Sequence, residues 1–259
     1  MSPVLDITIT NLDGPAIRCV LKLYDRWFGT SLRASYGEDP VPHTLASEAA
    51  FLGFVRRGMM PEFIGYLNEA NALVDQLPPV PRQFLDGTTK GQAKYEAALW
   101  RECNEHFRSE TQAYMRLASH RGKSVPRMLG HVRLAADGQI SSSRADIPPQ
   151  AASYFEVRGV LLELLDRYNL EDITTSPLAP LADDMAKWQQ IIQSAVDLAH
   201  EINELGIIIE DCAPRNVFVD RRSQTPYMVD LAQCLFPDEL VVQWHTWDLQ
   251  EEEGWDQDV

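Results

Sequence analysis

Two short runs near the start of the chain are rich in apolar residues, and the first of them alternates apolar and polar positions. Leu5, Ile7 and Ile9 recur at every second position, which places them on one face of a strand. A second run, rich in apolar and β-branched residues, covers 16–24, and a Gly-Pro turn signal separates the two runs. The pattern predicts a hairpin of two strands, with Lys22 inside the apolar second strand.

A long amphipathic helix is predicted over 90–119, where apolar residues recur every three or four positions. Its apolar face consists of Trp100, Cys103, Phe107, Tyr114 and Leu117. Glu110 occupies the gap in this stripe. A buried carboxylate needs a cationic or hydrogen-bonding partner, and Lys22 is a candidate. Alternatively, the helix rotates slightly and leaves Glu110 at the boundary with solvent.

Residues 30–87 have the character of an insertion, with short helices near 46–57 and 60–76 and a Pro-rich break between them and the long helix. Further strands are predicted at 127–134, 155–164, 217–219 and 227–229.

A second amphipathic helix is predicted over 181–205, with Gly206 as its C-cap. Its expected core face consists of Met185, Trp188, Ile192, Ala195, Ala199, Ile202 and Leu205. This order of elements predicts a mixed α+β fold in two parts.

Composition narrows the function classes. The 259 residues include 23 Lys and Arg against 38 Asp and Glu, a formal net charge of −15. Such an acidic chain is not expected to bind nucleic acid or an anionic membrane, because both require basic surface. No secretory signal or membrane span is visible, and the four cysteines are scattered. We therefore expect an intracellular protein, cytoplasmic or nuclear.

Three polar residues near the C-terminal end have the spacing expected of a metal site. Asp211 precedes Asn216 by 5 residues, and Asp230 follows Asn216 by 14, with a predicted hairpin between them. The hairpin is expected to return Asp230 to the side of Asn216. Carboxylate and amide oxygens are hard ligands that suit Mg²⁺ better than zinc.

This spacing resembles the catalytic loop of protein kinases, in which an Asp is followed by an Asn and, after a hairpin, by a metal-binding Asp. Here Asp230-Leu231-Ala232 stands where kinases have Asp-Phe-Gly. The string from Asp211 to Val217, Asp-Cys-Ala-Pro-Arg-Asn-Val, is similar to a group of small fungal protein-kinase-like proteins. The resemblance extends over roughly 16–236.

The resemblance implies ATP and Mg²⁺ as cofactors. Asn216 and Asp230 would hold the metal, and Asp211 would orient an acceptor hydroxyl and accept its proton. Lys22 would hold the α- and β-phosphates and be positioned by Glu110.

Two further assignments follow from the same resemblance. The strand end 160–165 resembles the hinge that holds adenine, so Glu163 and Leu165 are candidate nucleotide-binding residues. Arg215 either neutralises a phosphate or substrate charge or forms a surface ion pair.

The implied fold is a two-lobed kinase-like fold with a reduced N-lobe sheet, a helical insertion before the αC helix and a truncated C-lobe. Residues 1–165 would form the β-rich part with the insertion and the αC-like helix at 90–119. Residues 166–259 would form a compact C-lobe. The acidic tail over 245–259 is expected to fold back as a partly ordered helix; the alternative is a flexible tail.

Several positions depart from the kinase pattern. No Gly-rich loop precedes Lys22, Ile209 and Glu210 replace the usual His-Arg, and Leu231-Ala232 replaces Phe-Gly. The chain ends 29 residues after Asp230, so no large helical subdomain for protein substrates is expected.

Two function classes remain open. One is an ATP- and Mg²⁺-dependent phosphotransferase that acts on a small molecule rather than on a protein. The other is an inactive pseudokinase that binds nucleotide or a protein partner. An incomplete N-terminus would also account for the missing Gly-rich loop.

Overall fold

A computed structural model describes residues 3–10, 15–34, 39–72, 77–134, 148–180 and 184–241. The structure is mixed α+β with antiparallel strand pairs, which confirms the class predicted from the sequence. Its contacts divide the chain into two compact units. Unit 1 comprises Met1–Phe107 and Leu129–Leu162, and unit 2 comprises Arg108–Met128 and Glu163–Val259. The assignment of these parts to kinase-like lobes stays a prediction.

The predicted N-terminal hairpin is confirmed. Strands β1 (Val4–Ile9) and β2 (Ile17–Tyr24) pair antiparallel, and the register places Val4 opposite Lys22. The sheet has the order β1-β2-β4-β3, with β3 at Met128–Leu134 and β4 at Val157–Glu163.

Strand β4 approaches β2 closely at Gly159. A Cβ atom on this residue would lie 2.6 Å from the backbone oxygen of Lys22, so only glycine fits between the strands at this point. Strand β4 confirms the strand predicted over 155–164, but it begins two residues later than predicted. Phe155 instead ends the 3₁₀ helix η3 (Pro149–Phe155) and contacts Phe51 edge-to-face, at 5.6 Å between ring centroids.

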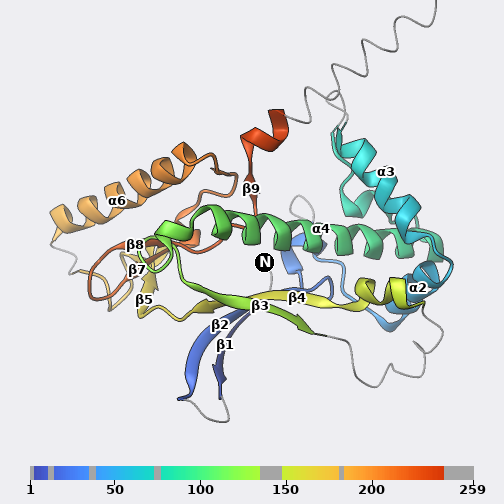
Figure 1. The fold of residues 1–259 in the computed structure, drawn as a ribbon, viewed down its shortest axis with the longest axis horizontal. Helices are drawn as coiled ribbons and strands as arrows, with labels where there is room; N and C mark the ends of the chain where they lie inside the picture. Colours follow the sequence, from blue (N-terminus) through green and yellow to red (C-terminus); the bar gives the residue numbers. More distant parts are fainter. Residues whose placement is uncertain are drawn as a thin grey trace, which may run out of the picture. The chain divides into compact units, whose positions relative to one another are not determined.

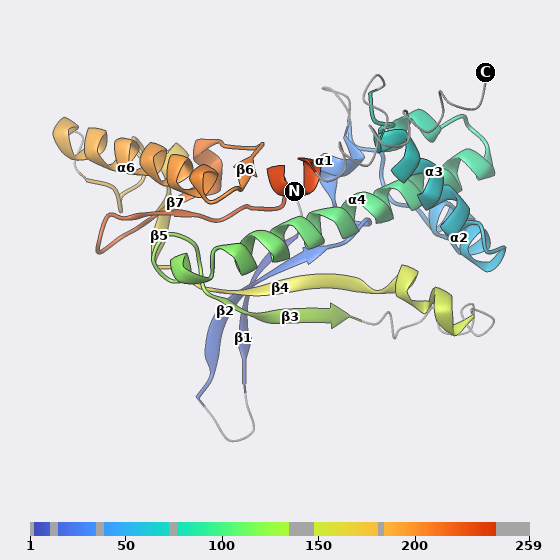
Figure 2. The same ribbon diagram turned by 45° about the horizontal axis from the view of Figure 1, so that its top comes forward.

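The insertion forms a helical cluster beside the N-terminal part of α4, as both views show (Figures 1 and 2). Its elements are α1 (Thr30–Arg33), α2 (Leu45–Arg56), α3 (Met60–Ala72) and the 3₁₀ helix η1 (Pro81–Phe84). Helix α2 begins with a capping box, in which the Thr44 side chain accepts a hydrogen bond from Ser47 N at 3.0 Å. Aromatic and aliphatic side chains of α2 and α3 then pack on the small residues Ala93, Ala97 and Ala98 of α4.

Helix α4 (Thr89–Arg116) confirms the predicted long helix, and the unit boundary falls within it. Its apolar stripe is buried as expected at Cys103, Tyr114 and Leu117. Glu110 has no exposed surface, so the alternative in which the helix rotates to leave it at the boundary is wrong.

Unit 2 contains a small antiparallel sheet of order β5-β7-β8, and helix α6 packs against β8 (Figure 1). The strands are β5 (Arg167–Asn169), β7 (Val217–Asp220) and β8 (Pro226–Met228), and the 3₁₀ helices η2 (Ala118–His120) and η4 (Leu170–Asp172) connect elements. Helix α6 (Met185–Glu204) has Asp184 as its N-cap, and the Asp184 carboxylate accepts a hydrogen bond from Lys187 N at 3.0 Å. Gly206 follows its C-terminus with φ +75°, the conformation expected of a glycine after a helix.

The predicted core face of α6 is partly wrong. Ala195 and Ile202 are buried, but Met185, Ile192 and Leu205 are 56%, 46% and 46% exposed. The buried row is instead Ile191, Ala195, Leu198 and Ile202. Apolar residues occupy adjacent positions along this helix, so its pattern permits two rotations, and packing against β8 selects one of them.

Some predictions lie outside the described residues. These are the turn over 11–14, the end of the second insertion helix at 73–76, the start of the second amphipathic helix at 181–183 and the tail helix over 245–259. Within the described part of the chain, no helix has the length and apolar character needed to cross a membrane.

Candidate functional site

Two short strands of unit 2 bring the loop at 210–216 beside the segment that follows Asp230. Strand β6 (Ile208–Ile209) pairs antiparallel with β9 (Cys234–Leu235). Directly after β6, the backbone N–H of Glu210 donates to the carbonyl of Gln233 at 3.0 Å. Segments that are more than 20 residues apart in the sequence therefore meet at the base of the candidate site.

Asn216 organises the loop. It ends the 3₁₀ helix η5 (Pro214–Asn216) and is only 8% exposed. Its side-chain Nδ2 donates to the backbone carbonyl of Asp211 and to the Asp211 carboxylate oxygen Oδ2, both at 2.9 Å. These two bonds close the loop over 211–216 and orient both side chains toward each other.

The hairpin returns the chain to this point, as the spacing predicts. Val217 on β7 faces Met228 on β8, and the N–H of Val229 donates to the carbonyl of Asn216 at 3.0 Å. Asp230 is the next residue, and its Oδ1 accepts a hydrogen bond from Ala232 N at 3.2 Å. The structure thus brings Asp211, Asn216 and Asp230 together at one end of the hairpin.

Arg215 adds a positive charge at the same place. Its Nη2 donates to Oδ1 of Asp211 in an ion pair whose side chains are 50% and 31% exposed. Asn169, at the end of β5, donates through Nδ2 to the backbone carbonyl of Arg215 at 2.8 Å. Both carboxylate oxygens of Asp211 are therefore engaged, one by an amide and one by a guanidinium.

The donor set suits a hard cation. Asn216 donates its amide N–H groups to Asp211, and within the described residues its amide oxygen makes no hydrogen bond. Together with the Asp230 carboxylate, it would supply oxygen ligands to Mg²⁺, which typically takes one or two carboxylates and completes its shell with phosphates and water. Among the described residues, no group of three or more His, Cys, Asp or Glu side chains forms a metal cluster. One carboxylate and one amide would therefore leave most of the coordination shell to phosphate oxygens and water.

Lys22 and Glu110 are both buried, at 5% and 0% exposure. Lys22 lies on β2 in unit 1, with its Nζ 5.6 Å from the centroid of the Tyr24 ring. Glu110 lies in the part of α4 that belongs to unit 2. Their pairing stays a prediction.

The two hinge candidates lie at the end of β4. The carboxylate of Glu163 accepts bonds from Arg127 N at 2.7 Å and Arg127 Nε at 2.8 Å. The N–H of Glu163 in turn donates to the Arg127 carbonyl at 2.9 Å. Leu165 accepts a bond from Arg167 Nη1 through its carbonyl at 3.3 Å. Both the side chain and the N–H of Glu163 therefore bond to Arg127. The assignment of Glu163 and Leu165 as nucleotide-binding residues stays a prediction.

Unit 1 contains a buried charge cluster that the sequence reasoning missed. Arg26 pairs with Glu48 and with Glu96, the latter at 2.6 Å, and Arg33 also contacts Glu96 at 2.8 Å. Burial opposes the charged form of Glu96, but His43, Arg26 and Arg33 outweigh it and lower the pKa of Glu96 to about 2. A signal was present, since Glu96 lies 7 and 14 residues before Cys103 and Glu110 and so shares the apolar face of the same helix.

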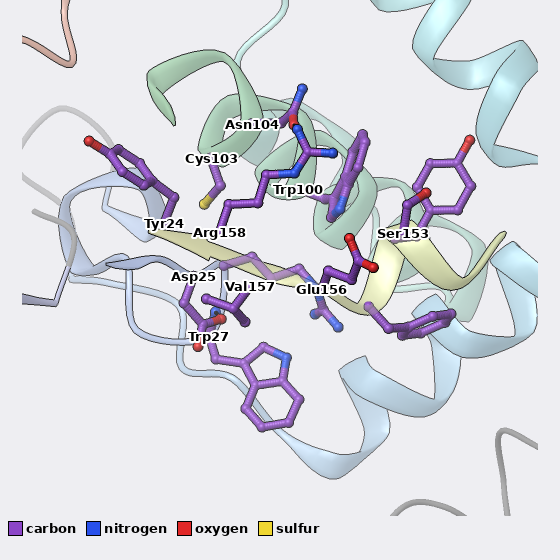
Figure 3. Close-up of a pocket in the computed structure, with 13 residues that line it drawn as sticks. Tyr24, Asp25, Trp27, Trp100, Cys103, Asn104, Ser153, Glu156, Val157 and Arg158 are labelled. Carbon is purple, nitrogen blue, oxygen red and sulfur yellow. Dashed lines mark hydrogen bonds between the residues drawn. The ribbon is translucent and has the colours of Figure 1, made fainter. Parts of the chain in front are cut away.

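Unit 1 also contains a cavity of about 120 Å³ near the start of β4, shown in Figure 3. Trp100 and Cys103 of α4 line one side, and Arg158 extends from β4 to donate to Asn104 Oδ1 at 2.9 Å. Burial raises the pKa of the Asp25 carboxyl, which also lines the cavity. None of the residues predicted to act in phosphate transfer lines this cavity.

Comparison with known proteins adds no assignment. No model of a protein family matches the chain, and no curated protein matches it either. A functional conclusion must therefore come from the residues themselves.

Proposed function

We propose that this protein is an ATP- and Mg²⁺-dependent phosphotransferase with a two-lobed, protein-kinase-like fold, and that its acceptor is a small molecule. The observation that carries the proposal is the meeting of Asp211, Asn216 and Asp230 at one end of the β7–β8 hairpin. Isolated Asp and Asn residues commonly cap turns. Three of them at this spacing, joined by direct bonds and an adjacent backbone pairing, favour a phosphate site.

The roles follow from the contacts. Asn216, oriented by Asp211, would present its amide oxygen beside the Asp230 carboxylate, and a Mg²⁺ ion bound there would neutralise phosphate charge. Lys22 would bind phosphate through its ammonium group. Asp211 would position the acceptor hydroxyl and take its proton on a carboxylate oxygen. Most of the catalysis would come from positioning and charge neutralisation.

The transfer itself is a simple displacement. The acceptor oxygen forms a bond to the γ-phosphorus while the bond from that phosphorus to the β–γ bridging oxygen breaks. ADP leaves with the electron pair of the broken bond, and the acceptor proton goes to Asp211.

Thermal unfolding with and without ATP and Mg²⁺ tests the proposal. Ligand at about 100 times its Kd should stabilise the protein by about 2.7 kcal/mol, or roughly 2–4 °C. We expect Asp230→Asn to abolish the Mg²⁺-dependent part of the shift. Asp211→Asn should retain the shift but lose the transfer of phosphate to an acceptor. Asp197→Asn, on the exposed face of α6, is the matched control and should behave as wild type.

Absence of any shift at millimolar nucleotide would contradict the proposal. An unchanged shift in Asp230→Asn would contradict the metal assignment. A shift without transfer to any acceptor would favour the alternative, an inactive kinase-like module that binds nucleotide.

A further inference from the structure

The guanidinium of Arg215 is only partly used. An arginine side chain offers five N–H donors in a planar fork. Within the described part of the chain, the Arg215 side chain makes one contact, from Nη2 to the Asp211 carboxylate, and it is 50% exposed. The remaining donors can therefore reach a ligand that lies against Asp211.

The backbone that carries this side chain is restrained by its neighbours. The Arg215 carbonyl is held by Asn169 at 2.8 Å, and the residue lies within η5, one residue before the buried Asn216. Strand β7 starts directly afterwards at Val217. A charged fork presented from such a restrained backbone loses less entropy on binding than one on a free loop.

Arg215 is a positive charge among acidic neighbours. Its neighbours in the loop and beyond the hairpin are acidic, namely Glu210, Asp211 and Asp230, and the chain as a whole carries a formal charge of −15. An acceptor with a negative group would be repelled by these carboxylates unless a cation lay among them. A cationic acceptor would be attracted by the carboxylates, but it would have to displace the guanidinium in order to reach Asp211.

We propose that the acceptor is an anionic alcohol, a small molecule that carries a hydroxyl and a carboxylate or phosphate, and that Arg215 is the residue that selects it. The inference rests on the proposed function. The guanidinium would bind the anionic group in a bidentate manner and move away from Asp211 as it does so. Asp211 would then be released to position the hydroxyl of the same molecule.

The test measures binding of four probes to the full chain, with and without Mg²⁺ and a non-hydrolysable ATP analogue, by titration calorimetry. The probes are glycerate, glycerol 3-phosphate, glycerol and ethanolamine. We expect the two anions to bind more tightly than glycerol or ethanolamine. Arg215→Gln should weaken binding of the anions about tenfold or more, the effect of losing a charged hydrogen-bonded pair. Arg215→Lys should bind with intermediate affinity, because it keeps the charge but loses the fork.

Arg222→Gln is the control, since Arg222 is an exposed arginine in the turn at the other end of the same hairpin. It should leave binding of every probe unchanged. Thermal unfolding of Arg215→Gln should match that of wild type, because an exposed ion pair on neighbouring turns stabilises little.

Three results would overturn the inference. The first is anion binding that is absent at millimolar concentrations or unchanged in Arg215→Gln, and the second is tighter binding of ethanolamine than of glycerate. The third is a variant that weakens the ATP analogue but not the anionic probes, which would assign Arg215 to the terminal phosphate of the nucleotide. Failure of wild type to bind the ATP analogue would count against the proposed function, whereas the titrations without nucleotide would still decide the role of Arg215.

Discussion

Arginine–carboxylate pairs occur in both units, and their surroundings differ sharply. In unit 1, Arg26 and Arg33 share the Glu96 carboxylate, and none of the three side chains is more than 7% exposed. In unit 2, Arg215 and Asp211 form a single pair that is 50% and 31% exposed. The first cluster joins the end of β2, the insertion and α4, whereas the second lies in a loop beside Asn216.

The difference in burial predicts different roles for the same chemical groups. A buried charge that loses its partner keeps its full desolvation cost, so each member of the unit 1 cluster needs the others. A half-exposed pair is screened by water and can be exchanged for a ligand at little cost. We therefore expect the unit 1 cluster to control stability and the unit 2 pair to control binding.

The largest expected effect is on stability, from Glu96→Gln. This change leaves Arg26 and Arg33 without their shared buried carboxylate, which should cost about 3–5 kcal/mol in the free energy of unfolding. Denaturant unfolding measures it. Glu102→Gln is the control on the same helix, because burial raises the pKa of Glu102 and neutralising it should cost little. Equal losses in the two variants would contradict a special role for the cluster.

Lowering the pH should remove the contribution of the same cluster to the free energy of unfolding. The folded-state pKa of Glu96 is about 2, below its ordinary value of 4.5, so its ionised form stabilises the fold above pH 4.5. That contribution, on the order of 3 kcal/mol, should disappear as the pH falls from 4.5 toward 2. The difference in unfolding free energy between wild type and Glu96→Gln should shrink over this range. A constant difference would show that Glu96 does not titrate there.

The smallest expected effect is the stability change in Asp211→Asn. Removing a half-exposed ion pair should alter the free energy of unfolding by less than about 1 kcal/mol, and the amide can still accept the bond from Asn216. Denaturant unfolding beside Glu96→Gln gives the direct comparison. A loss as large as that of Glu96→Gln would mean that the loop pair is structural after all.

Much of the local structure could be predicted from periodicity. The first hairpin, the long helix with Glu110 on its buried face and the return of Asp230 to Asn216 all follow from spacing, because side chains repeat every two positions in strands and every 3.6 in helices. The rotation of α6 could not be predicted, since adjacent apolar residues allow Ile191 or Ile192 to face the core. The late start of β4 depends on Phe155 packing against Phe51, a contact 104 residues apart in sequence.

Spacing along the chain was enough to single out Asp211, Asn216 and Asp230 as candidate site residues, because they lie at intervals that one loop and one hairpin span. Spacing could not show that Arg215 reaches the Asp211 carboxylate while staying half exposed, or that Asn169 bonds to the Arg215 backbone, because both contacts depend on the folded arrangement of the loop and β5. Nor could spacing show that Arg33, Glu48 and Glu96, from helices α1, α2 and α4, meet Arg26 of the turn after β2 in one buried cluster. Local spacing sets which side chains share a face, whereas burial and charge pairing depend on which distant segments pack together.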